Sequence, residues 1–156
     1  MSINNHWIER VIQMAEDNVQ KGEEPFAAIV VCGDEIVGTG VNCVHADHDP
    51  TSHAELLAIQ GACKQLNQID LSDCVLYASG EPCPMCMGAI YWAKLGAVYY
   101  ACSKEEAAAG AGFGDPIRHF FADMASSPEE RSIAFHHVDS TRKLEPFRIW
   151  SLKHNG

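Results

Sequence analysis

The 156-residue sequence predicts an α/β fold in a single domain that spans residues 1–156. Strand-like apolar runs alternate along the chain with segments of helical spacing, which is the pattern of a sheet covered by helices. A chain of this length with 47% hydrophobic residues buries one core and is too short for two ordinary domains. In an open α/β sheet, ligands gather at one end of the strands, so we expect the functional residues there.

The N-terminal part of the chain predicts a helix followed by a hairpin. Apolar residues recur at helical spacing from His6 to Val19, and Lys21-Gly22 ends this pattern. Phe26 to Val31 and Ile36 to Val41 are strand-like runs on either side of a Gly-Asp turn, which is typical of a β-hairpin. Residues 43–52 are rich in turn formers and predict a loop.

The remaining elements continue the alternation. A helix is predicted to open at Thr51 to Glu55 and to extend to Leu66, because Thr51 or Ser52 is a good N-cap for the apolar pattern that follows. The later predictions are strands at 74–78 and 97–101, helices at 84–93, 104–109, 117–124 and 146–153, a single helical turn at 127–130, and a last strand at 133–138.

Two short motifs at the start of two predicted helices carry metal-binding residues. His53 and Glu55 belong to His-Ala-Glu, and Cys83 and Cys86 belong to Pro-Cys-Pro-Met-Cys. One imidazole and two thiolates form a complete ligand set for catalytic zinc, which keeps its fourth position open for water. We therefore predict one zinc ion per chain, held by His53, Cys83 and Cys86, with Glu55 as the acid that moves protons. This pattern is the signature of zinc-dependent base deaminases.

The position of the motifs supports an open site over a closed structural one. The first turn of a helix favours anionic ligands, because its N–H groups are unsatisfied and its end is positive. A closed zinc site requires a fourth Cys or His, and the remaining candidates are His45 and His48. Both lie in the predicted loop and lack the helical placement of the other ligands, so we expect them to be ordinary loop histidines.

Charge and cysteine content restrict the partners and the compartment. The net charge of −10 argues against a nucleic-acid partner, since phosphate binding requires a basic face. No apolar run of about 18 residues is present to enter a membrane. The number of cysteines is odd, and the first residues lack a basic segment followed by an apolar one, so we predict a cytoplasmic protein with free thiols.

The residues from Pro25 to Ala101 resemble the cytidine-deaminase superfamily, in the branch that holds guanine deaminases and tRNA adenosine deaminases. The resemblance is closer to the guanine deaminases. It implies three α/β/α layers around a five-stranded mixed sheet, an intertwined homodimer with an exchanged C-terminal segment, and hydrolysis of guanine to xanthine and ammonia. The segments that match the guanine deaminases are Pro25-Phe26-Ala27-Ala28, Asn42, Asp49-Pro50-Thr51, His53-Ala54-Glu55, Glu81 to Cys86, Gly88 to Ala93 and Gly112 to Asp115. This likeness continues through Glu129-Glu130-Arg131 and Pro146-Phe147 to Trp150, so it spans nearly the whole chain.

The same resemblance implies roles for further residues. Asn42 would hydrogen-bond the base, Phe26 and Trp92 would form apolar walls, Ala54 would offer its backbone, and Asp115 would act as a second acid near the exocyclic amine. Each residue type has an ordinary alternative: Asn42 and Asp115 also suit turns, and the two aromatic residues also suit a core.

Three functions remain open at this point: deamination of a free base, deamination of adenosine in tRNA, and zinc binding without turnover. Guanine is the preferred free base, with cytosine or an aminotriazine as variants. The intact Glu55 argues against the third function. The acidic flanks of the motifs argue against the second, because contacts to RNA phosphates require basic residues. The flanks are Cys43 to Ser52 and Ser103 to Asp115. They contain one basic residue, Lys104, and five acidic residues, Asp47, Asp49, Glu105, Glu106 and Asp115.

Overall fold

The computed structural model describes residues 5–155, and its central element is a four-stranded mixed sheet. The strands are β1 (Ala27–Cys32), β2 (Glu35–Val41), β3 (Cys74–Gly80) and β4 (Ala97–Cys102), in the order β2-β1-β3-β4. β1 is antiparallel to both β2 and β3, whereas β3 and β4 are parallel. The predicted hairpin and the two later strands are therefore confirmed.

The expectation of five strands is wrong. The segment from Ile133 to Val138, predicted as the last strand, has no strand structure. A strand persists only beside a neighbour that takes up its backbone hydrogen bonds, and within residues 5–155 the backbone bond between this segment and another runs from Phe135 N to Pro128 O at 3.4 Å. The adjacent polar residues His136 and His137 also interrupt the alternation that a half-buried strand requires.

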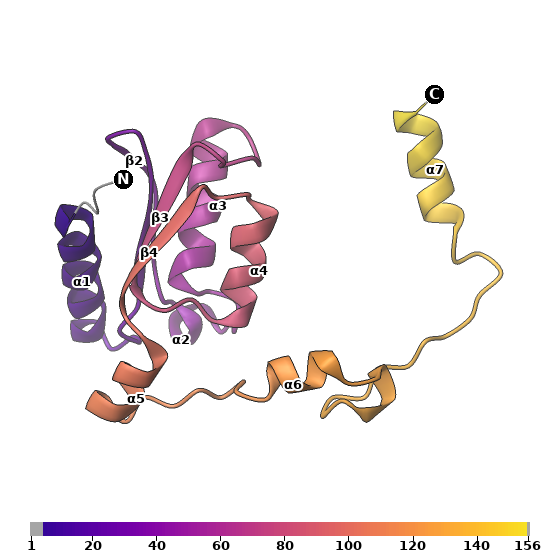
Figure 1. Ribbon diagram of the computed structural model, residues 1–156. Coiled ribbons are helices and arrows are strands. Elements are labelled where there is room, and N and C mark those ends of the chain that lie inside the picture. Colours follow the sequence, from indigo (N-terminus) through magenta and orange to yellow (C-terminus); the bar gives the residue numbers. More distant parts are fainter. Residues whose placement is uncertain (1–4, 156) are drawn as a thin grey trace. The chain divides into compact units, whose positions relative to one another are not determined.

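Helices cover both faces of this sheet, as Figure 1 shows. α1 (Asn5–Gln20) packs on one face, and α3 (Ala54–Leu66) and α4 (Pro84–Trp92) pack on the other. Alternate residues of β1 enter the two resulting cores, with Ile29 in the cluster below α1 and Val30 in the cluster below α3. A strand buried on both faces has no polar side to show, which explains why its sequence is continuously apolar.

Two glycines of β2 allow α3 to lie directly on the strand. A Cβ atom at Gly38 would come within 2.1 Å of the carbonyl oxygen of Ala58, and one at Gly40 within 2.1 Å of that of Ala54. No side chain fits between the two backbones at these points. The start of α3, which carries the His-Ala-Glu motif, is thereby fixed against the end of β2.

The remaining helical segments within residues 5–155 are each ten residues long or shorter. The predicted loop 43–52 contains one turn of helix, α2 (Val44–Asp47), which follows a hydrogen bond from Val44 N to Oδ1 of Asn42. Among residues 5–155, no helix combines the length and the apolar composition required to cross a bilayer. The other helices are α5 (Lys104–Ala111), which starts with a capping box, α6 (Phe120–Ala125), the 3-10 turn η1 (Pro128–Glu130) and α7 (Glu145–His154).

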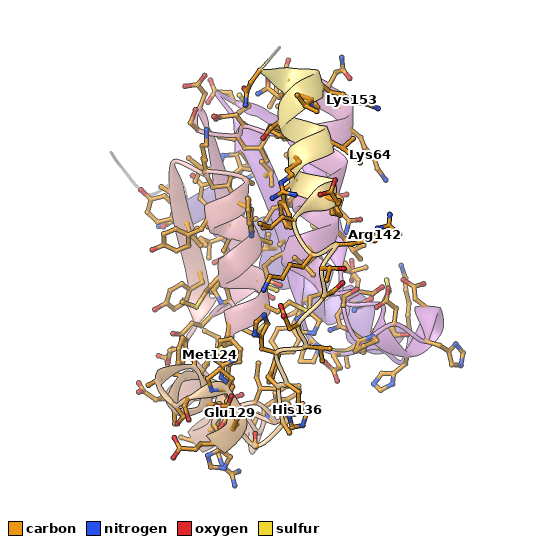
Figure 2. The ribbon with its side chains drawn as sticks, turned by 90° about the vertical axis from the view of Figure 1, so that its right-hand side faces the viewer. Lys64, Met124, Glu129, His136, Arg142 and Lys153 are labelled. Carbon is orange, nitrogen blue, oxygen red and sulfur yellow. The ribbon has the colours of Figure 1, made fainter. Side chains whose placement is uncertain are left out.

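The chain divides into two compact units, one that ends at Asp115 and one that begins at Pro116. None of the residues 116–155 is buried, and Met124, Glu129 and His136, which are labelled in Figure 2, are exposed. The second unit therefore has no core of its own. Its exposed large apolar residues are Ile117, Phe120, Phe121, Met124, Ile133, Phe135, Val138, Leu144, Phe147, Ile149, Trp150 and Leu152.

Candidate active site

The three predicted zinc ligands meet between the N-termini of α3 and α4. His53 is the N-cap residue of α3, Cys83 is the N-cap residue of α4, and Cys86 lies in the first turn of α4. Pro84 occupies the first position of α4, where its missing N–H costs nothing and its fixed φ favours the helix. The carboxyl end of β3 leads the chain into this turn, so the site lies where the sequence predicted it.

The distances between the ligand atoms fit a tetrahedral zinc ion. Cys83 Sγ lies 3.5 Å from His53 Nδ1, Cys86 Sγ lies 3.6 Å from the same nitrogen, and the two sulfur atoms are 3.6 Å apart. Ordinary zinc bonds at tetrahedral angles separate nitrogen from sulfur by about 3.6 Å and two sulfurs by about 3.8 Å. In residues 5–155 neither His45 nor His48 belongs to the cluster, so the donor set is three.

Electrostatic interactions within the cluster favour the thiolate at Cys83. The hydrogen bond between the two thiols lowers the pKa of Cys83 to about 4, and the bond with His53 acts in the same direction. The contact with Cys83 raises the pKa of Cys86, and burial adds to this effect. The hydrogen bond with Cys83 also raises the pKa of His53, with smaller contributions from the charges of Glu55 and Glu24. Zinc binds the thiolate form, which the cluster supplies at Cys83.

Glu55 lies beside the ligand cluster without belonging to it. Glu55 is 5% exposed, and its Oε2 accepts a hydrogen bond from Cys86 Sγ at 3.4 Å. Burial raises the pKa of this carboxyl group. A carboxyl group with a raised pKa, close to a metal site but outside its donor set, is suited to hold and release a proton.

Phe26 packs against Phe113 of the Gly-rich loop, residues 110–114, and against Gly80, which precedes the Glu-Pro-Cys motif; its role as an apolar wall stays a prediction. Its ring meets that of Phe113 edge to face, with centroids 5.2 Å apart, and it lies against Gly80, where a Cβ atom would come within 3.0 Å of Phe26 Cε1. The Gly-rich loop is thereby attached to the motif region. A glycine directly before Glu-Pro-Cys was the available signal for this close packing.

Asn42 and Ala54 are both buried at the same end of the sheet. Asn42 is 1% exposed, its Nδ2 donates to Glu24 Oε2 at 3.3 Å, and its Oδ1 accepts from Val44 N at 3.2 Å. Each amide atom retains one further hydrogen-bonding position. Ala54 is the first residue of α3 and is fully buried. Their roles toward a base stay predictions.

The structure does not bring Asp115 and Trp92 into the ligand cluster. Asp115 Oδ2 lies 4.0 Å from Lys104 Nζ, at the start of α5. Trp92 is 88% exposed at the C-terminal end of α4, about 13 Å along the helix axis from Cys83. The roles of Asp115 as a second acid and of Trp92 as an apolar wall stay predictions.

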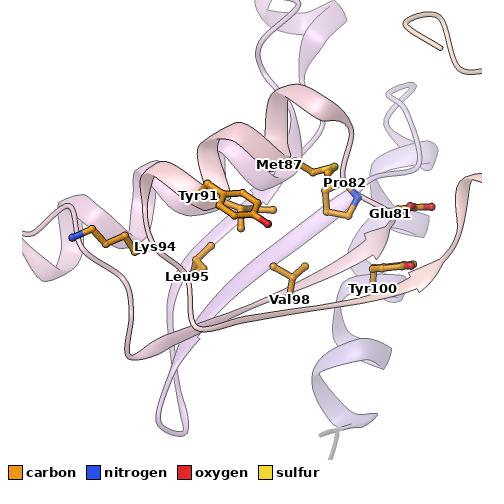
Figure 3. A pocket seen from close by; sticks show the side chains of 9 residues that line it. Glu81, Pro82, Met87, Tyr91, Lys94, Leu95, Val98 and Tyr100 are labelled. Carbon is orange, nitrogen blue, oxygen red and sulfur yellow. The ribbon is translucent and has the colours of Figure 1, made fainter. Parts of the chain in front are cut away.

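An open groove of about 620 Å³ runs between α4 and the edge strand β4. Figure 3 shows Met87 and Tyr91 on its helix side and Val98 and Tyr100 on its strand side. Its walls are mostly apolar, and Tyr91 is 81% exposed. The groove lies along α4, on a surface distinct from the ligand cluster.

Comparison with known proteins places this geometry in a family. Residues 1–102 match the family model of the cytidine and deoxycytidylate deaminase zinc-binding region. The chain is 44% identical to guanine deaminase of Bacillus subtilis over 94% of both proteins, and 38% identical to tRNA-specific adenosine deaminase of Aquifex aeolicus over 62% of this chain and 64% of that protein. The crystal structure of the Bacillus subtilis guanine deaminase superposes with a TM-score of 0.89 over 97% of this chain and 95% of the other, at 41% identity. The chain therefore belongs to the zinc-dependent cytidine and deoxycytidylate deaminase family, and His53, Cys83 and Cys86 form the candidate zinc site.

Proposed function

We propose that this protein is a guanine deaminase, which hydrolyses guanine to xanthine and ammonia. The observation that carries the proposal is the 44% identity to a guanine deaminase over 94% of both chains, combined with an intact ligand cluster. Coverage of 94% includes most of the C-terminal unit, whereas the tRNA-specific adenosine deaminases of Xenopus laevis and Aquifex aeolicus align with 64% and 62% of the chain.

The residues of the site divide the reaction between them. Zinc, when bound, supplies a Lewis acid that makes water reactive near neutral pH. Glu55 takes one proton from the attacking water and delivers it to the ring nitrogen, and then carries the second proton of that water to the leaving amine; its buried position beside Cys86 is suited to this. Phe26 offers an apolar face to the purine, Asn42 and the Ala54 backbone orient it, and Asp115 assists proton transfer at the exocyclic amine.

The acidic surroundings of the site favour a free base over tRNA adenosine. Asp49 and Glu106 each keep a lowered pKa through hydrogen bonds, to Thr51 and Ser103 respectively, and therefore stay charged at neutral pH. A rim of negative charge repels a polyanion, whereas neutral guanine enters without this penalty. Cytosine and aminotriazines remain the alternatives among free bases.

We also propose that the protein is a cytoplasmic homodimer that exchanges its C-terminal segment, so that the two units of one chain complete a single domain with a partner. A segment that has no buried residue among those described, and that exposes many large apolar side chains, requires another surface to cover it. The apolar groove beside the edge strand β4 is such a surface. In a dimer, Trp92 can line the pocket of the partner. The seven cysteines are all free, which fits a reducing compartment.

A substrate panel tests the proposed reaction. Purified zinc-loaded protein is incubated with guanine, adenine, cytosine, guanosine and an anticodon-stem RNA, and ammonia release is measured. We expect rapid release from guanine and formation of xanthine. Conversion of adenosine to inosine in the RNA, without ammonia release from guanine, would assign the protein to the tRNA-modifying branch. A zinc-loaded protein that releases ammonia from none of these substrates would have a binding function.

A further inference from the structure

Glu24 contacts Asn42, the residue proposed to orient the base. Its Oε2 accepts the hydrogen bond from Asn42 Nδ2 at 3.3 Å, and its Oε1 faces Nε2 of His45 at 3.6 Å. The His45 side chain is 68% exposed, so water screens this pair and it orders the carboxylate only weakly. The buried amide of Asn42 is therefore the stronger anchor for Glu24.

The backbone around Glu24 is tied to the end of β2 by a buried side chain. Asn18 is 3% exposed, and its Nδ2 donates to the carbonyl oxygen of Glu24 at 2.9 Å and to that of Asn42 at 2.9 Å. An amide nitrogen carries two N–H groups, and both are used here. Asn18 thus fixes the distance between the two backbones from which the Glu24 and Asn42 side chains extend.

These contacts allow a single orientation of the Asn42 carboxamide. Oδ1 accepts from Val44 N and Nδ2 donates to Glu24 Oε2. A rotation by 180° would place two acceptors together at Glu24 and two donors together at Val44. The observed orientation leaves one N–H of Nδ2 and one lone pair of Oδ1 in a fixed order.

We propose that Glu24 is a positioning residue that sets which atom of the Asn42 carboxamide donates to the bound base and which accepts. The inference rests on the proposed function, in which Asn42 contacts guanine. A purine presents donors and acceptors in a fixed order, so a fixed amide distinguishes guanine from 2,6-diaminopurine, in which an amino donor replaces the 6-oxo acceptor. An amide released from Glu24 rotates more freely and adapts to both bases.

Steady-state kinetics of three variants test this role. Glu24→Ala removes the anchor, Glu24→Gln keeps an acceptor for Asn42 Nδ2, and Glu23→Ala is the matched control, because Glu23 Oε1 binds Ala46 N at 2.8 Å and does not contact Asn42. For Glu24→Ala we expect the KM for guanine to rise about tenfold with kcat within about threefold, the size of one hydrogen bond to a charged group. The ratio of the inhibition constant of 2,6-diaminopurine to the KM for guanine should fall by a similar factor. Glu24→Gln should restore both quantities, and Glu23→Ala should leave both unchanged.

Any one of three results overturns the proposal: an unchanged KM for guanine in Glu24→Ala, a KM in Glu24→Gln that rises as much as in Glu24→Ala, or the same rise of KM in Glu23→Ala. Failure of the proposed function is a separate outcome, seen as wild-type protein that releases no ammonia from guanine. In that case, hydrogen exchange of the Asn42 side-chain amide, measured by NMR on the zinc-loaded protein, tests the anchoring. We expect faster exchange in Glu24→Ala than in wild type, and equal exchange rates would refute the anchoring of Asn42 by Glu24.

Discussion

Gly40→Ala is expected to displace the helix that carries His53 and Glu55. The added Cβ atom would lie 2.1 Å from Ala54 O, about 1.3 Å closer than the 3.4 Å at which ordinary contact begins. The three nearest atoms are Ala54 O, Ala58 N and Leu57 Cβ, and all three are fixed by the helix backbone, so no side-chain rotation relieves the overlap. The start of α3 must therefore move away from β2 by about 1 Å.

This displacement should affect stability and activity together. Overpacking of this kind costs about 3 kcal/mol or more, which lowers the melting temperature by roughly 6 to 12 °C in a domain of this size. A shift of about 1 Å in the catalytic groups lowers kcat/KM by about 10²-fold. Thermal melting, zinc analysis and guanine kinetics measure these effects on the purified variant.

Gly61→Ala is the matched control, because it adds the same methyl group between the same two elements. Its Cβ atom would lie 3.6 Å from Gly38 Cα, which is ordinary contact. Replacing a glycine inside α3 should stabilise the protein by up to about 1 kcal/mol without loss of activity. A Gly40→Ala protein that melts within about 2 °C of wild type and keeps its kcat/KM would refute the argument that the α3 backbone is fixed against β2.

Three further predictions concern the site and the surface. Glu55→Gln should lower kcat by about 10³-fold while one zinc per chain is retained, whereas Cys83→Ser should lose the metal as well; metal analysis of both variants distinguishes a proton carrier from a ligand. Asp115→Asn should lower kcat by about 10²-fold with a melting temperature close to wild type, and a normal kcat would exclude proton transfer by this residue. The hydrogen bond from Lys94 holds the pKa of Asp70 at about 2. The stabilisation from this pair is therefore present above about pH 4 and is lost as the pH falls towards 2. An NMR titration in which Asp70 keeps its usual pKa would contradict this prediction.

The zinc ligands were predictable because their spacing is local to two helix starts. A His-x-Glu and a Pro-Cys-x-x-Cys motif each place their side chains within one turn, so the sequence specifies the donor set before the fold is known. The alternation of strands and helices, which the structure confirms, brings the two helix N-termini together at one end of the sheet.

Features that depend on distant contacts were not predictable in this way. The apolar run from Ile133 to Val138 resembles a strand, but a strand also requires a partner, and the described chain supplies none for it. The contact between Glu24 and Asn42 joins side chains 18 residues apart, and no sequence motif connects the two positions. The packing of Phe26 on Gly80 is likewise visible only once the strands are paired.

The position of the ligands at two helix caps makes the zinc ion a cross-link in the chain. His53 and Cys83 are 30 residues apart, and the segment between them contains α3 and β3. A cross-link that closes a loop of this length lowers the entropy of the unfolded chain by an amount worth about 4 kcal/mol in the chain-entropy model. Elements inside the loop therefore open less readily in the metal-loaded protein. α1 and β2 lie outside the loop, so local opening there should be less sensitive to chelators than opening of α3 and β3.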